Sequence, residues 1–513
     1  MKKLLFSFLS LIFFTVSPVF SQTGSLSVKT WIDKEITEDT RPEGRIFLFV
    51  SKSKNSQPRL NTWPNRNNII YATNLENFQK GDEFIFDNSK NLSGIFDFNP
   101  GEIPNGSYMV QVLWDHDNKE SDINAPGNLY SESVLINLNS DSICLELPLT
   151  QTIETVRLAE HPLLKEVEIQ SKVLSKWRKK EIRLKAAVLL PSGYYDEPDR
   201  KYPVRYNIAG FGGRYTRANK FVTWDKKFLK WWLSDDAPQI INVFLDSEGP
   251  FGDCYQLDSK NNGPYGTALI NEFIPYIENK FRATGNPENR FLDGCSTGGW
   301  VSLALQIFYP DQFGGCFSYS PDPVDFENFQ LINIYRDENA FFNEYGYLRP
   351  LSRNITGEPV VSQKDFILYE NVLGRSNSYV TSGGQFGSFN ALFSPKGRDG
   401  LPKPLFDPLS GKIDKEVAEH WRKYDLKYYL ENNWAKVGPK IHGKIWIWMG
   451  DMDEFYLNTA LRAFEEMLQV QDNPESDASI NFSPMSGHCA RYSHEKVLLQ
   501  IAEKLENQIH DVD

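Results

Sequence analysis

A serine set between glycines, with a buried strand before it and a helix after it, constrains this chain most. Gly294-Cys-Ser-Thr-Gly298 follows the apolar pair Phe291-Leu292 and precedes an amphipathic stretch over 301–309. A sharp turn from strand to helix needs small residues on both sides of the serine, because two backbones approach there. The helix also directs free N–H groups and the positive end of its dipole at the serine. We therefore predict that Ser296 is a nucleophile; the alternative is a structural glycine turn.

The first residues predict export. Met1-Lys-Lys3 precedes a short apolar run over 4–16, and Pro18 ends this run. The run is too short to span a bilayer, and small residues follow it near Ser21. We expect residues 1–21 to be a cleaved signal peptide, and the mature protein to be secreted or periplasmic without stable membrane insertion.

Charge and cysteine content exclude some classes of protein. A net charge of −12 over 513 residues, without a basic cluster, argues against nucleic acid as a partner. The five cysteines are too few for a disulfide scaffold, and their odd number leaves at least one unpaired. We interpret Cys144, Cys254 and Cys316 as small core residues.

Residues 22–150 predict an all-β sandwich (Ig-like) domain whose role the sequence does not indicate. Short alternating segments recur at regular intervals, separated by Gly, Pro, Asn and Asp clusters and without a helical stretch. The predicted strands are 45–50, 83–86, 94–98, 107–114, 133–137 and 143–147.

Residues 151–513 predict an α/β domain with a doubly wound, mostly parallel sheet. After an antiparallel pair (165–171 and 181–190), strands alternate with helices, which is typical of a sheet covered on both faces. Pro275 lies inside a predicted helix over 266–281, where we expect a kink or an overwound turn. The alternation lapses at about 322–437, apart from a charged helix over 414–429. We interpret this segment as a lid-like insertion.

A nucleophilic serine needs a base, and the base needs an acid to orient it. On a sheet of this kind both follow the serine in the chain, at carboxyl ends of strands. His488 lies between the last strand and the last helix and is the predicted base; His494, expected in solvent on that helix, is the alternative. Asp453, just past the next-to-last strand, is the predicted acid, with Asp451 and Glu454 as alternatives.

Two backbone N–H groups should hold the oxyanion. We predict Thr297, directly after the nucleophile, and Phe211 in the loop Gly210-Phe-Gly-Gly213, with Gly212 as the alternative to Phe211. No metal or other cofactor is expected, because His494-Glu495 lacks the second histidine of a zinc protease motif.

Cys295 and Cys489 lie next to Ser296 and His488 in the sequence. If the serine and the histidine are within hydrogen-bond reach, their neighbours are within disulfide range, and an exported protein meets an oxidising compartment. We therefore predict a Cys295–Cys489 disulfide; two ordinary buried thiols are the alternative.

From about residue 165 onward the chain resembles the putative esterase family, the esterase D-like branch of the α/β-hydrolases. This family includes S-formylglutathione hydrolase, feruloyl, acetylxylan and enterochelin esterases, and mycolyltransferases. The matching pieces are Tyr202-Pro-Val204, Gly210-Phe-Gly-Gly213, Asn262-Gly-Pro-Tyr-Gly266, Phe273-Ile-Pro-Tyr-Ile277, Gly294-Cys-Ser-Thr-Gly-Gly299, Tyr309-Pro-Asp-Gln-Phe-Gly314, Ser320-Pro321, Gly450 with Asp453, and Gly487-His488.

The resemblance implies serine ester hydrolysis with Ser296, Asp453 and His488 as the triad. Three features depart from the family pattern: Ala209 stands where the family often has histidine, the insertion is longer, and the Cys-Ser and His-Cys pairs are more similar to tannases and fungal feruloyl esterases, in which these cysteines are bridged.

We expect an exported carboxylic ester hydrolase that acts on acylated or feruloylated polysaccharide or oligosaccharide. One alternative is siderophore ester cleavage or acyl transfer at the same site. An alternative of another class is a glycan-binding protein with a vestigial hydrolase site.

Overall fold

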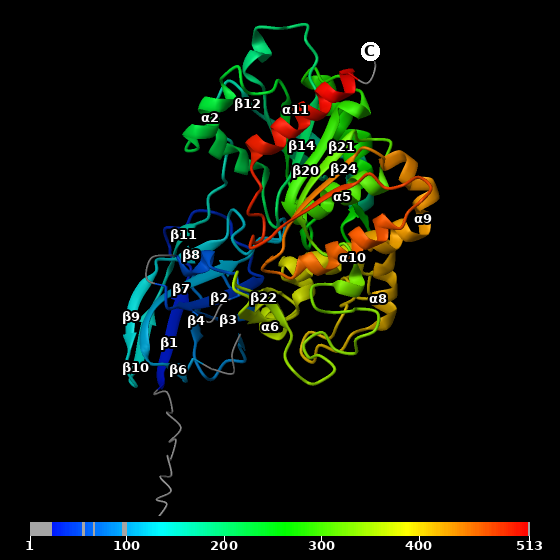
Figure 1. Ribbon diagram of the computed structural model, residues 1–513. Helices are drawn as coiled ribbons and strands as arrows, with labels where there is room; N and C mark the ends of the chain where they lie inside the picture. Colours follow the sequence, from blue (N-terminus) through cyan, green and yellow to red (C-terminus); the bar gives the residue numbers. More distant parts are fainter. Residues whose placement is uncertain (1–22, 54–56, 65–66, 95–99, 511–513) are drawn as a thin grey trace, which may run out of the picture.

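The computed structural model describes residues 23–53, 57–64, 67–94 and 100–510, and the predicted signal peptide lies outside these ranges. An N-terminal part made of β strands lies beside a larger part in which helices surround a sheet (Figure 1).

Two β sheets form the N-terminal part and enclose an apolar core that includes Leu26, Val28 and Trp114. The smaller sheet contains β1 (Thr23–Trp31), β4 (Glu83–Phe86), β6 (Ile103–Pro104) and β10 (Ser142–Glu146). The larger sheet contains β2 (Gly44–Ser51), β3 (Asn68–Leu75), β5 (Ser93–Gly94), β7 (Gly106–Asp115), β8 (Leu129–Ser131), β9 (Val134–Leu138) and β11 (Leu149–Thr152). Five of the six predicted strands are present; most of the sixth, 94–98, lies outside the described residues.

Strand β2 is apolar on both faces because both faces are covered. Ile46, Leu48 and Val50 point into the core between the two sheets. Phe47 and Phe49 belong to a second apolar cluster, in which helix α6 (Gln363–Leu373) packs on the outer face of the larger sheet. The unbroken run Ile-Phe-Leu-Phe-Val therefore indicates a contact with the C-terminal part of the chain.

An eight-stranded sheet organises the C-terminal part and confirms the predicted α/β fold. Its strand order is β12-β13-β15-β14-β20-β21-β24-β25. The first three strands pair antiparallel and all later neighbours pair parallel. The strands are β12 (Leu164–Gln170), β13 (Arg183–Leu189), β14 (Val204–Ile208), β15 (Ile241–Leu245), β20 (Arg290–Ser296), β21 (Gly315–Pro321), β24 (Ile445–Gly450) and β25 (Ser479–Ser483).

Helices cover both faces of this sheet. Figure 1 shows α2 (Lys226–Trp232) and α11 (His494–His510) on one side, and α5 (Thr297–Phe308), α9 (Leu426–Ile441) and α10 (Leu457–Gln469) on the other. Helix α5 is buried along almost its whole length, so it has no polar outer face. The short helix α1 (Lys172–Arg178) links β12 to β13, and two short hairpins, β16–β17 (248–249 and 252–253) and β18–β19 (258–259 and 263–264), follow β15.

The helix around Pro275 differs from the prediction of a kink or an overwound turn. Helix α3 (Tyr265–Ala268) continues into a π-helical turn over Leu269–Phe273 and then into α4 (Ile274–Lys280). The N–H of Ile274 bonds to the carbonyl of Leu269, five residues back. The widened turn makes room for a proline that has no N–H to donate.

The predicted insertion contains helices and strands of its own. It contains the hairpin β22–β23 (Pro350–Arg353 and Pro359–Ser362) and the helices α6, α7 (Gln385–Phe393) and α8 (Lys415–Trp421). The predicted single helix over 414–429 is two helices, because the chain turns at Asp425, whose side chain caps α9. Since α9 packs against α5 and α10, the last part of the segment 322–437 covers the sheet.

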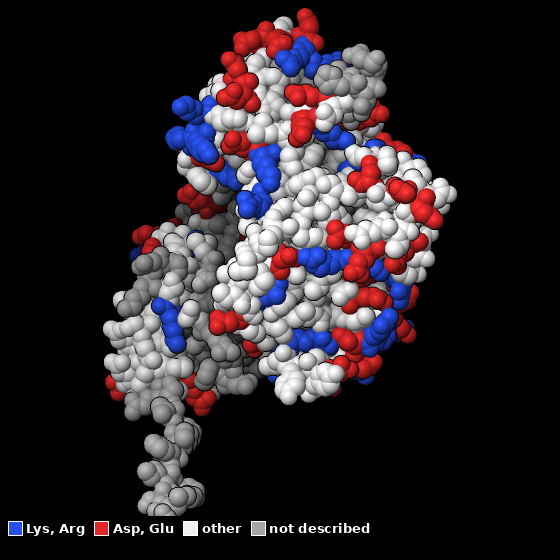
Figure 2. Space-filling view, in the orientation of Figure 1, with Lys and Arg blue, Asp and Glu red and all other residues white. Residues whose placement is uncertain are grey.

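Surface features bear on several expectations. On the face shown in Figure 2, basic side chains lie among acidic ones. Within the described residues, no helix is both long and apolar enough to cross a membrane.

Cys254 and Cys316 are buried as expected, but Cys144 is exposed on β10, so its interpretation as a core residue is wrong. Its strand lies at the edge of the smaller sheet, where alternate side chains face solvent.

Candidate active site

Ser296 occupies the turn from β20 into α5. Its backbone has φ of 60° and ψ of −127°, a strained conformation for a residue with a side chain. A Cβ atom at Gly294 would lie 2.4 Å from the carbonyl carbon of Gly298, and one at Gly298 would lie 2.3 Å from the carbonyl oxygen of Ile208. The two glycines are therefore required by close backbone approach.

His488 and Asp453 form a hydrogen-bonded pair. The ring Nδ1 lies 2.7 Å from Oδ2 of Asp453, which is fully buried. The other oxygen, Oδ1, accepts the backbone N–H groups of Phe455 (2.9 Å) and Leu457 (3.4 Å), so the carboxylate cannot rotate freely. Because a carboxylate only accepts, His488 donates through Nδ1 and keeps its lone pair on Nε2.

The two alternative acids have other partners. Glu454 accepts the backbone N–H of His488 and so holds the histidine loop without contacting the ring nitrogens. Asp451 pairs with Arg462 on the surface. Of the three carboxylates, only Asp453 is hydrogen-bonded to the His488 ring.

The charge of Asp453 also sets the basicity of His488. Burial lowers the pKa of the imidazole, but the charge of Asp453 and its hydrogen bond outweigh burial and hold the pKa above its ordinary value. The carboxylates of Asp322 and Glu454 act in the same direction. This environment stabilises an imidazolium, the species that forms when the ring accepts a proton.

His494 is not the solvated residue that the sequence indicated. It begins α11, is partly buried, and its ring packs against Phe221. Its Nδ1 lies 3.1 Å from the Arg205 guanidinium, which forms a buried ion pair with Asp293. Burial, followed by the charge of Arg205, holds the pKa of His494 well below its ordinary value, so this ring is a neutral acceptor.

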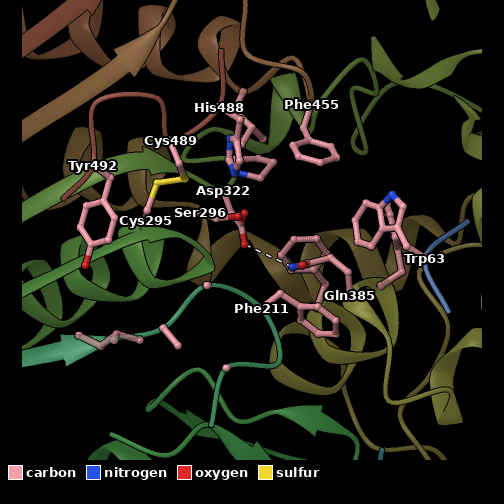
Figure 3. A pocket seen from close by; sticks show the side chains of 18 of the residues that line it. Trp63, Phe211, Cys295, Ser296, Asp322, Gln385, Phe455, His488, Cys489 and Tyr492 are labelled. Atoms are coloured by element: carbon pink, nitrogen blue, oxygen red, sulfur yellow. Dashed lines mark hydrogen bonds between the residues drawn. A yellow bond between two sulfur atoms is a disulfide. The ribbon is translucent and has the colours of Figure 1, made fainter. Parts of the chain in front are cut away.

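A disulfide joins Cys295 to Cys489, as the sequence predicted, with 6.0 Å between the Cα atoms (Figure 3). It connects the residue before Ser296 with the residue after His488. The bond therefore ties the histidine loop to the turn that carries the serine.

Ser296 and His488 line one cavity of about 580 Å³, together with apolar side chains (Figure 3). Among the described residues, no hydrogen bond joins the serine hydroxyl to the histidine ring. Contacts of this kind commonly tighten only when substrate binds.

The loop after β14 also lies close to the serine. A Cβ atom at Gly210 would lie 3.5 Å from the carbonyl oxygen of Cys295, so the two backbones are nearly in contact. Phe211 lines the cavity with Ser296, whereas Gly212 lines a neighbouring cleft. Thr297 is buried as the first residue of α5. Both predicted donors are thus positioned beside the serine, and their role stays a prediction.

Asp322, a buried carboxyl group beside the nucleophile, was not predicted from the sequence. Its Oδ2 accepts the Thr297 hydroxyl at 2.8 Å, with Gln385 Nε2 and the Tyr255 hydroxyl both at 3.4 Å (Figure 3). Burial raises its pKa to about 6. A signal existed, because Asp322 directly follows β21, just as Asp453 follows β24 closely.

Comparison with known proteins gives a family. The model of the family described as Putative esterase matches residues 180–497. Solved structures with similar folds include a ferulic acid esterase (16% identity, TM-score 0.41, covering 66% of this chain and 97% of that one). Another is an S-formylglutathione hydrolase from Agrobacterium tumefaciens (15% identity, TM-score 0.35, covering 68% and 93%).

The curated relative "Uncharacterized protein YbbA" of Bacillus subtilis (strain 168) is 38% identical over 56 residues, which is 11% of this chain. The match spans only 22% of that relative's length. The family model, in contrast, spans more than half of this chain and includes every strand of the eight-stranded sheet from β14 to β25. The chain therefore belongs to the putative esterase family and is a serine esterase with an α/β-hydrolase fold.

Proposed function

We propose that this protein is an exported esterase in which Ser296, His488 and Asp453 form the catalytic triad. The observation that carries this proposal is that the strained turn at Ser296 and the hydrogen-bonded pair His488–Asp453 lie together, with the Cys295–Cys489 disulfide joining the serine turn to the histidine loop. Export is supported by the apolar N-terminal run and by this disulfide, which suits an oxidising compartment.

The proposed reaction follows from these positions. The Ser296 hydroxyl attacks the ester carbonyl while Nε2 of His488 takes its proton, and Asp453 stabilises the imidazolium. The N–H groups of Thr297 and Phe211 hold the negative oxygen of the tetrahedral intermediate. The intermediate collapses as His488 returns the proton to the leaving alcohol. Water then attacks the acyl-enzyme through the same base, and the carboxylic acid departs.

We propose acylated or feruloylated polysaccharide or oligosaccharide as the substrate class. The support is an apolar cavity wall that includes Phe211, Phe386, Phe389 and Phe455 beside the serine, which suits a bulky or aromatic acyl group.

The test is a panel of p-nitrophenyl acetate, methyl ferulate, acetylated xylan and a catecholate siderophore. We expect hydrolysis of at least p-nitrophenyl acetate and methyl ferulate. In Ser296→Ala, kcat should fall by a factor on the order of 10⁶. Ser89→Ala, at an exposed N-terminal turn, is the matched control and should keep full activity. Turnover of the siderophore alone would refute the substrate class. Activity that survives in Ser296→Ala would refute the mechanism.

A further inference from the structure

One residue in the lining of the catalytic cavity comes from the N-terminal β part of the chain. Trp63 lies between a short 3₁₀ helix (Pro58–Leu60) and β3, more than 200 residues before Ser296, and lines the same cavity. In Figure 3 its indole lies across the cavity from the disulfide, on the segment that belongs to the N-terminal part.

The indole is part of an aromatic series that reaches the catalytic base. Its ring centroid lies 5.1 Å from Phe366 and 6.0 Å from Phe455, both at edge-to-face angles. Phe455 in turn lies 5.0 Å from the His488 ring, at 85°. These are the geometries that aromatic pairs prefer. Trp63 is thus one aromatic ring away from the proposed base.

The segment that carries Trp63 is anchored to the α/β part. The Tyr369 hydroxyl on α6 donates to the carbonyl of Asn61, two residues before Trp63, at 3.2 Å. The side-chain amide of Asn68 donates to the same carbonyl at 2.7 Å. Two hydrogen bonds therefore fix the backbone beside the indole.

The domain contact around this segment is extensive. Buried Arg45 donates to the Val372 carbonyl at 2.9 Å, and Arg375 pairs with Asp115 at 2.8 Å. Further along, Arg214 pairs with Glu120 at 2.6 Å. Together with the apolar packing of α6 on β2 and β3, these polar contacts hold the N-terminal part against the α/β part.

Trp63 also separates the cavity from a second space, whose lining includes charged side chains. A cleft of about 270 Å³ between the two parts of the chain is lined by Ser121, Asp122, Arg214 and Glu248. Trp63, Phe211, Phe366 and Gln385 line both spaces, so they form the partition. Trp63 is 47% exposed, so part of its indole surface is accessible to a ligand.

We propose that Trp63 is a specificity-determining residue, through which the N-terminal β part completes the pocket for the apolar group of the ester. This inference rests on the proposed function of Ser296. A group as small as acetyl stays near the serine and the base. A planar or branched apolar group that extends past Phe455 reaches the indole and gains apolar and aromatic contact there.

The experiment measures kcat/KM for p-nitrophenyl acetate and p-nitrophenyl 3-phenylpropanoate. In Trp63→Ala the ratio of phenylpropanoate to acetate activity should fall about tenfold, mainly through KM, which is within the range for lost pocket contacts. Trp63→Phe should recover part of the ratio. Trp224→Ala removes an indole that is 72% exposed outside the cavity, and should leave the ratio unchanged.

Two results would contradict the inference at different levels. If Trp63→Ala keeps a ratio within about twofold of wild type while its hydrolysis still requires Ser296, the role of Trp63 is refuted and the proposed function stands. If wild type shows no hydrolysis that depends on Ser296, the proposed function fails first. A thermal unfolding midpoint near that of wild type shows that Trp63→Ala is folded.

Discussion

Removal of the Cys295–Cys489 disulfide tests how the two halves of the site are held together. The bond spans 194 residues. In the chain-entropy model a loop of this length stabilises the folded state by about 5 kcal/mol at 25 °C. An α/β part of roughly 360 residues has an unfolding entropy of about 0.76 kcal/mol/K, so the expected loss in melting temperature is about 7 °C.

The variant is Cys295→Ala with Cys489→Ala, which leaves no unpaired thiol at the site. Activity should fall by about tenfold or more, because the His488 loop is no longer tied to the Ser296 turn and small displacements of reacting groups are costly. Differential scanning fluorimetry and ester hydrolysis, with and without dithiothreitol, measure both effects.

Three comparisons make this prediction sharp. Wild type treated with dithiothreitol should approach the double variant, and the double variant should not respond to dithiothreitol. Cys144→Ala, at an exposed cysteine outside the bond, should behave as wild type. A double variant that melts within about 1 °C of wild type with full activity would refute the role assigned to this bond.

Three further predictions concern the catalytic pair and the glycine turn. Asp453→Asn should lower kcat on the order of 10⁴, whereas Asp451→Asn, which loses only a surface ion pair, should keep it within about twofold; equal effects would contradict the assignment of the acid. The kcat/KM should fall as pH drops through the pKa of His488, with a midpoint above 6.5 because Asp453 raises this pKa; a midpoint clearly below 6.5 in a pH–rate profile would argue against the charged pair. Gly298→Ala places a Cβ atom 2.3 Å from the Ile208 carbonyl oxygen, and should destabilise the fold by about 3 kcal/mol or more. A soluble variant that melts at the wild-type temperature would contradict the close approach.

The α/β part could be predicted well because its signals are local. Strands such as β15 and β24 are short, mostly apolar runs, and the loops after β24 and β25 carry Asp453 and His488. Asp453 and His488 followed from chain order and from position past a strand. The cysteine pair followed from adjacency to the same two loops.

Several other contacts between distant parts of the chain could not be predicted. Trp63 stands among Pro and Asn residues, and nothing local places it 6.0 Å from Phe455. The solvated position expected for His494 was wrong because its neighbour Arg205 lies on a strand almost 300 residues earlier. Strand β8 spans only three residues, too few to reveal a period.

Some signals were present but were not used. Strand β1 alternates buried and half-exposed residues over its whole length, which is the pattern of a strand with one buried face. Residues 46–50 within β2 are all apolar, which indicated a second contact face beyond the sandwich core.

Labelling with a fluorophosphonate tests the central claim most directly, because it reports an activated serine without knowledge of the substrate. We expect one label per wild-type chain, located on Ser296 by peptide mapping. The label should be absent in Ser296→Ala. In His488→Ala the labelling rate should be lower than in wild type by a factor on the order of 10³ or more. Wild-type protein that stays unlabelled, or that carries its label on another residue, would contradict the proposed triad.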